Sequence, residues 1–329
     1  MSEPRLPAGA AEAATLNRRA ALASIAVALV LVGLKLWAAW RTGSSAMLGS
    51  LADTALDLVA SLATLAGVWI ASWPPDRSHR FGHGKAEALA AMLQVVLIAL
   101  SAAGLAVRAG LQLARGGRTA GAESGIAVAL MAMAATLALL AYQRRVLART
   151  GSLAIAADHL HYQSDLALNL AVIAALALDQ WGGVSRADPL FALGIAAWLG
   201  WGAWRASQAA VEQLMDREWP EARRQRFLAV AAQHPQLRGV HDLRTRTSGT
   251  HDFAQFHAAV DGRMSVAEAH RVMDEIEAEL EREFPGVEVL IHPDPEGLID
   301  EQGIAAEELL PRRRALRRAR QQQGRKANG

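Results

Sequence analysis

Four residues with metal-ligating side chains repeat one spacing inside two apolar segments. Asp53 and Asp57 are four residues apart in the middle of one segment, and His161 and Asp165 are four residues apart in another. In a helix this spacing puts both members of a pair on one face, about a turn apart. Three carboxylates and one imidazole are enough to coordinate a divalent metal ion tetrahedrally without cysteine. These four residues are the first candidate site.

The site has two alternatives to a metal. Each ionised group at the centre of a bilayer costs roughly 2.5–3.5 kcal/mol on insertion scales, so three unpaired carboxylates would cost about 10 kcal/mol together. Lys35 and Arg108, near the ends of apolar segments, could each pair with one carboxylate, and the four groups could instead relay protons. Two cations can neither neutralise three carboxylates nor account for the histidine, which favours a metal. The imidazole disfavours Ca²⁺ and Mg²⁺. Zn²⁺ fits best, with Fe²⁺, Cd²⁺, Co²⁺ and Mn²⁺ as alternatives.

The composition is that of a membrane protein. Of the 329 residues 52% are hydrophobic and none is cysteine, which excludes disulfides and thiolate ligation. Six segments reach the roughly 17–25 apolar residues that span a bilayer. They are about 20–40, 46–71, 86–111, 123–143, 157–179 and 188–209. The first is too long for a cleaved signal peptide. We therefore expect an α-helical membrane protein with six transmembrane helices.

Basic residues indicate the orientation. The N-terminal arm and the second and fourth loops carry more Arg and Lys than the first and fifth loops. The positive-inside rule therefore predicts that both termini are cytoplasmic.

A soluble domain is expected after the last span. Hydrophobic periodicity predicts the order αββαβ, a small α+β fold with helices on one face of a sheet. The expected elements are helix 221–233, strands 239–247 and 252–260, helix 265–283 and strand 287–292. The expected domains are a flexible cytoplasmic N-terminus (1–17), a six-helix transmembrane domain (18–215), a cytoplasmic metal-binding domain (216–298) and a basic tail (299–329). We expect the tail to be disordered, with binding to anionic lipid as the alternative.

Several motifs resemble the cation diffusion facilitator family, and most closely its bacterial zinc and ferrous-iron efflux transporters. The similarity runs from about residue 18 to 298. The motifs are Asp53-x-x-x-Asp57, His161-x-x-x-Asp165, Phe81-Gly82-His83-Gly84-Lys85-Ala86-Glu87 and His241-Asp242-Leu243-Arg244-Thr245-Arg246.

The resemblance implies a homodimer in the bacterial inner membrane that exchanges cytoplasmic metal for external protons. It also implies a ferredoxin-like, metallochaperone-like cytoplasmic domain with a binuclear site of regulatory metal. Three further sets of residues follow from it: a loop site of Asp76, His79 and His83, a cytoplasmic site of His241, His257, His270, His292 and Asp294, and a dimer charge pair of Lys85 and Asp216.

Residue positions alone support the two additional metal sites more weakly. The loop residues are equally compatible with solvated side chains, and single histidines are mostly surface groups. Three histidines at strand positions, with an aspartate two residues after the last, favour a site. A site shared across a dimer interface would explain why its groups need not converge in one protomer.

The expected function is a proton-coupled metal cation antiporter rather than an enzyme. Metal ligands must lose protons to bind, so metal and protons compete for one site. The chain has neither the nucleotide-binding run Gly-x4-Gly-Lys-Ser/Thr nor the metalloprotease motif His-Glu-x-x-His. A metal-gated channel or metal-sensing receptor is the main alternative, and an intramembrane metalloenzyme is the second. We expect no cofactor beyond transported and regulatory metal, and no nucleic-acid partner.

Overall fold

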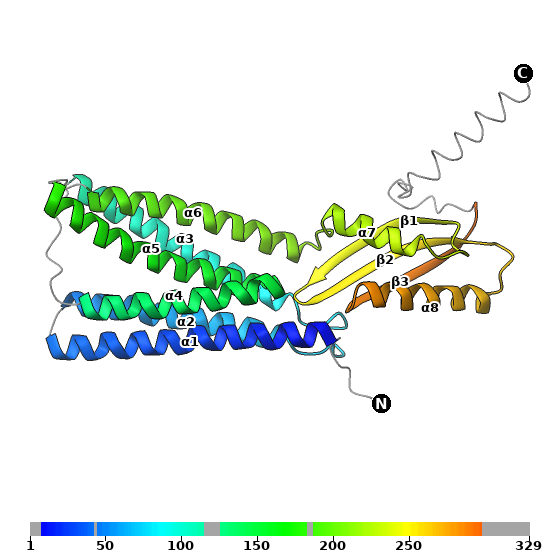
Figure 1. Ribbon diagram of the computed structural model, residues 1–329, viewed down its shortest axis with the longest axis horizontal. Coiled ribbons are helices and arrows are strands. Elements are labelled where there is room, and N and C mark those ends of the chain that lie inside the picture. The colour runs from blue at the N-terminus through cyan, green and yellow to red at the C-terminus, as the bar shows by residue number, and fades with distance from the viewer. Residues whose placement is uncertain (1–7, 43–44, 115–125, 183–186, 298–329) are drawn as a thin grey trace, which may run out of the picture. The chain divides into compact units, whose positions relative to one another are not determined.

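Six long α-helices make up the first part of the chain. The computed structural model describes residues 8–42, 45–114, 126–182 and 187–297. The helices are α1 (Ala8–Thr42), α2 (Ser45–Ala71), α3 (Ala86–Ala114), α4 (Ile126–Thr150), α5 (Leu153–Gly182) and α6 (Ala187–Leu214). They lie side by side along their lengths (Figure 1).

Three of these helices satisfy the length and apolarity needed to cross a membrane. Among the described residues the qualifying stretches are Ala11–Ala38, Thr54–Ala71 and Ala86–Ala114. The three corresponding predicted spans are thereby supported. The spans expected in α4, α5 and α6 stay predictions, and the first residues of the expected span 123–143 lie outside the described part of the chain.

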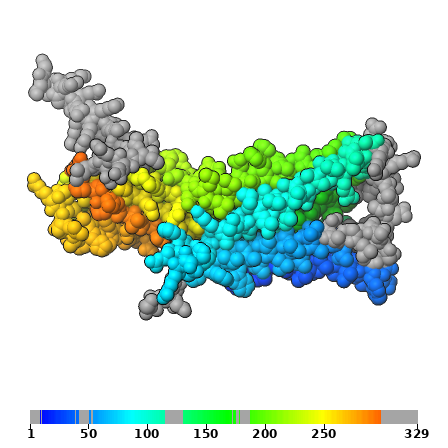
Figure 2. All heavy atoms as spheres, turned by 180° about the vertical axis from the view of Figure 1, so that it is seen from behind, coloured from blue at the N-terminus to red at the C-terminus, as the bar shows by residue number. Residues whose placement is uncertain are grey.

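Helix α3 is central to the packing of this bundle. It contacts α2, α5 and α6, and Figure 2 shows it in cyan between the blue atoms of α1 and α2 and the green atoms of α5 and α6. Helices α2 and α3 approach each other closely at Gly67. A Cβ atom built there would lie 2.3 Å from the Ala90 Cβ and 3.1 Å from the Ala86 carbonyl oxygen. Only a residue without a side chain allows this crossing.

Replacing Gly67 by alanine is therefore expected to destabilise the bundle by about 1–3 kcal/mol, the usual effect of overpacking. A lower thermal unfolding midpoint of the purified protein would report the change. The matched control is Gly104→Ala in α3, because a Cβ at Gly104 meets nothing within 4 Å. Equal midpoints for the two variants would contradict the close crossing.

The second part of the chain has the predicted order αββαβ. It contains α7 (Glu221–Ala231), β1 (Gly239–Ser248), β2 (His251–Val260), α8 (Val266–Glu283) and β3 (Val287–Pro295). The strands form one sheet in the order β1-β2-β3, with β1 antiparallel and β3 parallel to β2. Gly249, with φ of 61°, makes the tight turn between β1 and β2. Helix α8 connects the parallel strands β2 and β3, as a parallel pair requires.

Both helices pack on one face of the sheet. Phe227 of α7 and Ile276 and Leu280 of α8 join Phe256 of β2 in a buried core. Ser265 begins α8 with a capping box: its side chain accepts from the Glu268 amide while the Glu268 side chain accepts from the Ser265 amide. Because neighbouring residues of a strand point to opposite faces, His257 faces away from the helices.

The chain divides into two compact units, each with its own packing. One contains Ala11–Met215 and the other begins at Asp216. The predicted flexible N-terminus is described only from residue 8 onward, and the predicted basic tail lies outside the described residues.

Candidate metal centres

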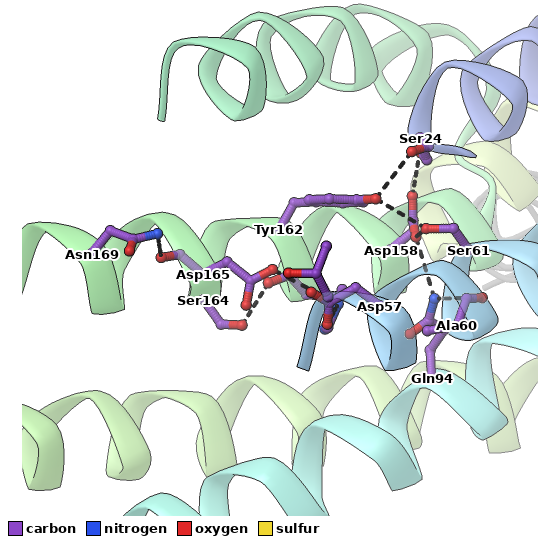
Figure 3. A network of polar contacts seen from close by, with 12 residues as sticks. Ser24, Asp57, Ala60, Ser61, Gln94, Asp158, Tyr162, Ser164, Asp165 and Asn169 are labelled. Atoms are coloured by element: carbon purple, nitrogen blue, oxygen red, sulfur yellow. Dashed lines mark hydrogen bonds and ion pairs between the residues drawn. The ribbon is translucent and has the colours of Figure 1, made fainter. Parts of the chain in front are cut away.

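Helices α2 and α5 bring together three of the four predicted ligands in the first unit. Asp57, His161 and Asp165 each offer a ligand atom, and these atoms lie within 4.8 Å of one another. The His161 Nε2 is 3.0 Å from an Asp57 oxygen and 3.8 Å from an Asp165 oxygen. We call these three residues the α2–α5 cluster (Figure 3). Asp53 lies one turn before Asp57 in α2, but its side chain is outside the described part of the structure.

The histidine nitrogen of the α2–α5 cluster fits a metal ligand. His161 Nε2 is buried and lies 3.0 Å from an Asp57 oxygen, close enough for an ion pair when the ring is protonated. A neutral ring presents the same nitrogen as an acceptor beside two carboxylates. The group could then hold a metal ion in place of the proton.

Hydrogen bonds to the backbone support the same turns of α5. The Ser164 hydroxyl donates to the His161 carbonyl oxygen at 2.5 Å, and the Asn169 amide donates to the Asp165 carbonyl oxygen at 2.8 Å. Both contacts are drawn in Figure 3. Both are local contacts within α5, and neither reaches a ligand side chain.

Lys35 contacts the segment of α2 between its two acidic residues. Its ammonium donates a hydrogen bond to Thr54, which is buried and lies between Asp53 and Asp57 in the sequence. Pairing of Lys35 with a carboxylate therefore stays an alternative for one acidic group.

Asp158 is a buried carboxylate whose importance the sequence did not reveal. It has no exposed surface and accepts hydrogen bonds from Ser24, Ser61, Gln94 and Gln143. Its spacing from His161 and Asp165 was the available signal, because positions 158, 161 and 165 share one helix face.

The loop between α2 and α3 holds the second cluster. Asp76 Oδ1 lies 3.4 Å from His79 Nδ1, and Asp76 Oδ2 lies 3.3 Å from His83 Nε2. The amides of Ser78 and His79 donate to Asp76 at 2.7 and 2.6 Å. The hydrogen bond from the His79 amide is the main cause that lowers the pKa of Asp76 below its usual value. An ionised carboxylate beside two imidazoles can bind a divalent metal at the bundle end.

The third cluster lies on the open face of the sheet. The register pairs His241 with His257 across β1 and β2, and His257 with His292 across β2 and β3. Strands are about 4.8 Å apart, so the three rings form a row. Neighbouring ring centroids are 5.2 and 4.7 Å apart.

Asp294 is the acidic centre of this row. Its Oδ2 lies 2.8 Å from His257 Nδ1 and 3.1 Å from His241 Nε2, and its Oδ1 lies 3.3 Å from His292 Nε2. Asp242 adds a second carboxylate 4.0 Å from His257 Nε2. Sequence reasoning missed Asp242 as a site residue because it turns toward the row only through an irregularity of β1, where its φ is 50°.

His270 is the one predicted ligand of this domain that does not join the row. Its side chain is 75% exposed on α8, and it lies 3.7 Å from Asp274. A role at a site shared with a second protomer stays a prediction.

The two residues of the predicted dimer charge pair, Lys85 and Asp216, each contact a different part of the chain. The Lys85 ammonium donates to the Leu214 carbonyl oxygen at 3.1 Å, within the first unit. Asp216 Oδ2 lies 3.7 Å from Arg246 Nη1, within the second. Their pairing between protomers stays a prediction.

Comparisons with known proteins cover both units. Residues 21–215 match the family of cation efflux transmembrane domains, and residues 219–296 match the cytoplasmic domain of cation efflux proteins. The cation-efflux pump FieF of Pectobacterium atrosepticum is 44% identical over 283 residues, which are 86% of this chain and 94% of that protein. FieF of Yersinia enterocolitica is 42% identical over 296 residues, 90% of this chain and 98% of that protein.

A solved structure also resembles part of the chain. The metal-bound C-terminal domain of the CzcD transporter from Thermotoga maritima is 28% identical, with a TM-score of 0.24, and the match covers 25% of this chain and 100% of that one. With two domain matches in the expected order and full-length relatives, this chain is a membrane protein of the cation diffusion facilitator family of metal cation efflux transporters.

Proposed function

We propose that this transporter exports divalent metal cations from the cytoplasm in exchange for protons, with Zn²⁺ as the favoured cargo and Fe²⁺ and Cd²⁺ as further substrates. The observation that carries the proposal is the α2–α5 cluster, whose three ligand atoms lie within 4.8 Å of one another. Two carboxylates and one imidazole suit a borderline ion better than Ca²⁺ or Mg²⁺. Asp53, one turn away on α2, would be the fourth ligand.

Proton exchange follows from the chemistry of these ligands. The His161 nitrogen that faces Asp57 can hold either a proton or a metal ion, but not both. Metal arriving from the cytoplasm would displace protons, and protons arriving from outside would displace the metal. One fixed site that opens alternately to either side is sufficient for this cycle.

The proposal includes an arrangement for the rest of the chain. All six helices α1–α6 span the inner membrane, both termini are cytoplasmic, and two copies form a homodimer. The domain that follows residue 215 senses cytoplasmic metal through the row of three histidines and Asp294. The loop residues Asp76, His79 and His83 form a further site at the cytoplasmic surface.

A pH-jump experiment on reconstituted vesicles tests the function. Vesicles containing the purified protein and a zinc-sensitive dye are given Zn²⁺ outside, with and without an acidic interior. We expect that the proton gradient accelerates Zn²⁺ uptake and that Zn²⁺ uptake in turn raises the interior pH. A metal-gated channel would give Zn²⁺ flux without any movement of protons, and that result would overturn the antiport proposal.

A further inference from the structure

Asp158 connects α5 to four other helices in the interior of the first unit. It has no exposed surface. Its carboxylate accepts hydrogen bonds from Ser24 of α1 at 2.6 Å, Ser61 of α2 at 3.4 Å, Gln94 of α3 at 3.3 Å and Gln143 of α4 at 2.8 Å. Figure 3 shows Ser24, Ser61 and Gln94 converging on it from different helices. We call Asp158 and these four partners the α5 hub.

The strongest part of the α5 hub is a closed ring of three residues. The Ser24 hydroxyl and the Gln143 amide both donate to Asp158 Oδ2, and the Gln143 amide also donates to the Ser24 oxygen at 3.0 Å. All three side chains are fully buried. The three contacts join α1, α4 and α5 in one buried network, which favours one mutual rotation of these helices.

The α5 hub reaches the metal ligands through Tyr162. The Tyr162 hydroxyl donates to the Ser24 carbonyl oxygen and shares a hydrogen bond with Ser61, both at 3.1 Å. The Tyr162 ring meets the His161 ring edge-on, with centroids 5.6 Å apart. Tyr162, the residue next to the ligand His161, is thus held by α1 and α2, two of the four helices that hold Asp158.

Asp158 also shares the ligand-bearing face of α5. It precedes His161 by three residues and Asp165 by seven, which places all three on one side of the helix. A rotation of α5 by about 20° would move an atom 5 Å from the helix axis by about 2 Å. Metal–ligand distances tolerate only about 0.2 Å. The rotation of α5 therefore decides whether His161 and Asp165 meet Asp57.

We propose that Asp158 is a positioning residue that sets the rotation of α5, and through it the metal affinity of the α2–α5 cluster, by means of its hydrogen bonds to Ser24 and Gln143. The inference rests on the proposed transport function, since the affinity concerned is that of the transported ion. Asp158 itself does not bind the metal.

The test compares the metal dependence of transport in Asp158 variants of the full-length protein. Initial rates of Zn²⁺ uptake into vesicles are measured over a range of Zn²⁺ concentrations. We expect Asp158→Ala to raise the KM for Zn²⁺ about 10–100-fold, as the loss of partners behind metal ligands does elsewhere. Asp158→Asn keeps an oxygen for Ser24 and Gln143 and should raise KM by no more than about fivefold, the net effect of one hydrogen bond.

Two further variants separate positioning from general stability. Ser24→Ala removes the two hydrogen bonds that the Ser24 hydroxyl makes with Asp158 and Gln143 and leaves the carboxylate in place. It should also raise KM at least about fivefold, which keeps the test valid if Asp158→Ala does not fold. The matched control is Glu87→Gln. Glu87 is likewise a buried carboxylate held by neutral donors, Asn17 at 3.1 Å and Ser152 at 2.6 Å, and neither donor belongs to the cluster or to the hub. Its KM should remain that of the wild type.

The possible outcomes are distinct. A purely structural role of Asp158 would lower the thermal unfolding midpoint and the maximal rate without changing KM, which would overturn the inference. Equal increases in KM for Asp158→Ala and Asp158→Asn would also overturn it, since charge rather than hydrogen bonding would then matter. If the wild type itself shows no saturable Zn²⁺ transport, the result contradicts the proposed function. A result that contradicts only the positioning role of Asp158 would appear in the variants and not in the wild type.

Discussion

Asp57→Asn is expected to reduce metal transport more than about 100-fold, because removal of even an outer-shell partner of a metal ligand costs 10–100-fold. The substitution keeps the size of the side chain but replaces the carboxylate that lies 3.0 Å from His161 Nε2 by a neutral amide. The α2–α5 cluster would then lose one of the negative charges that attract a divalent cation. The measurement is the initial rate of Zn²⁺ uptake into vesicles that contain equal amounts of protein.

Asp188→Asn is the matched control for this substitution. Asp188 is a carboxylate in the first turn of α6, and its Oδ2 accepts a hydrogen bond from Gln112 at 2.9 Å. It belongs to none of the three clusters. We expect its transport rate to stay within about twofold of the wild type, as for most substitutions away from a site. Wild-type transport by Asp57→Asn would exclude the α2–α5 cluster as the transport site.

Asp294→Ala is expected to abolish the response of the C-terminal domain to metal. Asp294 is the only described carboxylate within 3.3 Å of all three histidines of the row. In the wild type, metal at a concentration of 100 times its dissociation constant should slow hydrogen exchange in the C-terminal domain by up to about 100-fold. The variant should show no such slowing. Hydrogen exchange of peptides from β2 and β3 in the full-length protein measures this locally, without interference from metal bound in the helical unit.

Glu288→Gln provides the control for Asp294→Ala. Glu288 is an exposed carboxylate on the same strand, β3, outside the histidine row. Its metal-dependent protection should equal that of the wild type. If Asp294→Ala kept full protection by metal, the row of histidines would not be a metal site.

The sequence was sufficient to predict the local structure of both units. Apolar segments of spanning length predicted the long helices, since a helix in lipid satisfies its own backbone hydrogen bonds. The alternation of apolar residues predicted β1 and β2, and the 3.6-residue period predicted α8. The pairs Asp53/Asp57 and His161/Asp165 were recognised in a similar way, because residues four apart lie on the same face of a helix.

Contacts between elements could not be predicted in this way. The row of His241, His257 and His292 depends on the register of three strands, one of them irregular between His241 and Arg244. A shift of that register by one residue would turn His257 toward the helices. The exposed position of His270, by contrast, follows from the sequence of α8, whose apolar residues Ala269, Val272, Met273, Ile276 and Leu280 lie on another face of the helix.

The sequence thus determined two separate pairs of potential ligands, Asp53/Asp57 and His161/Asp165, each on one helix face. Only the tertiary structure decided that α2 and α5 face each other with ligand atoms of Asp57, His161 and Asp165 within 4.8 Å of one another. It also decided that Asp158 lies behind them in a buried hydrogen-bond hub. The physical reason is that helix periodicity fixes which residues share a face, whereas the rotation of one helix against another depends on side chains from distant parts of the chain, such as Ser24 and Gln143.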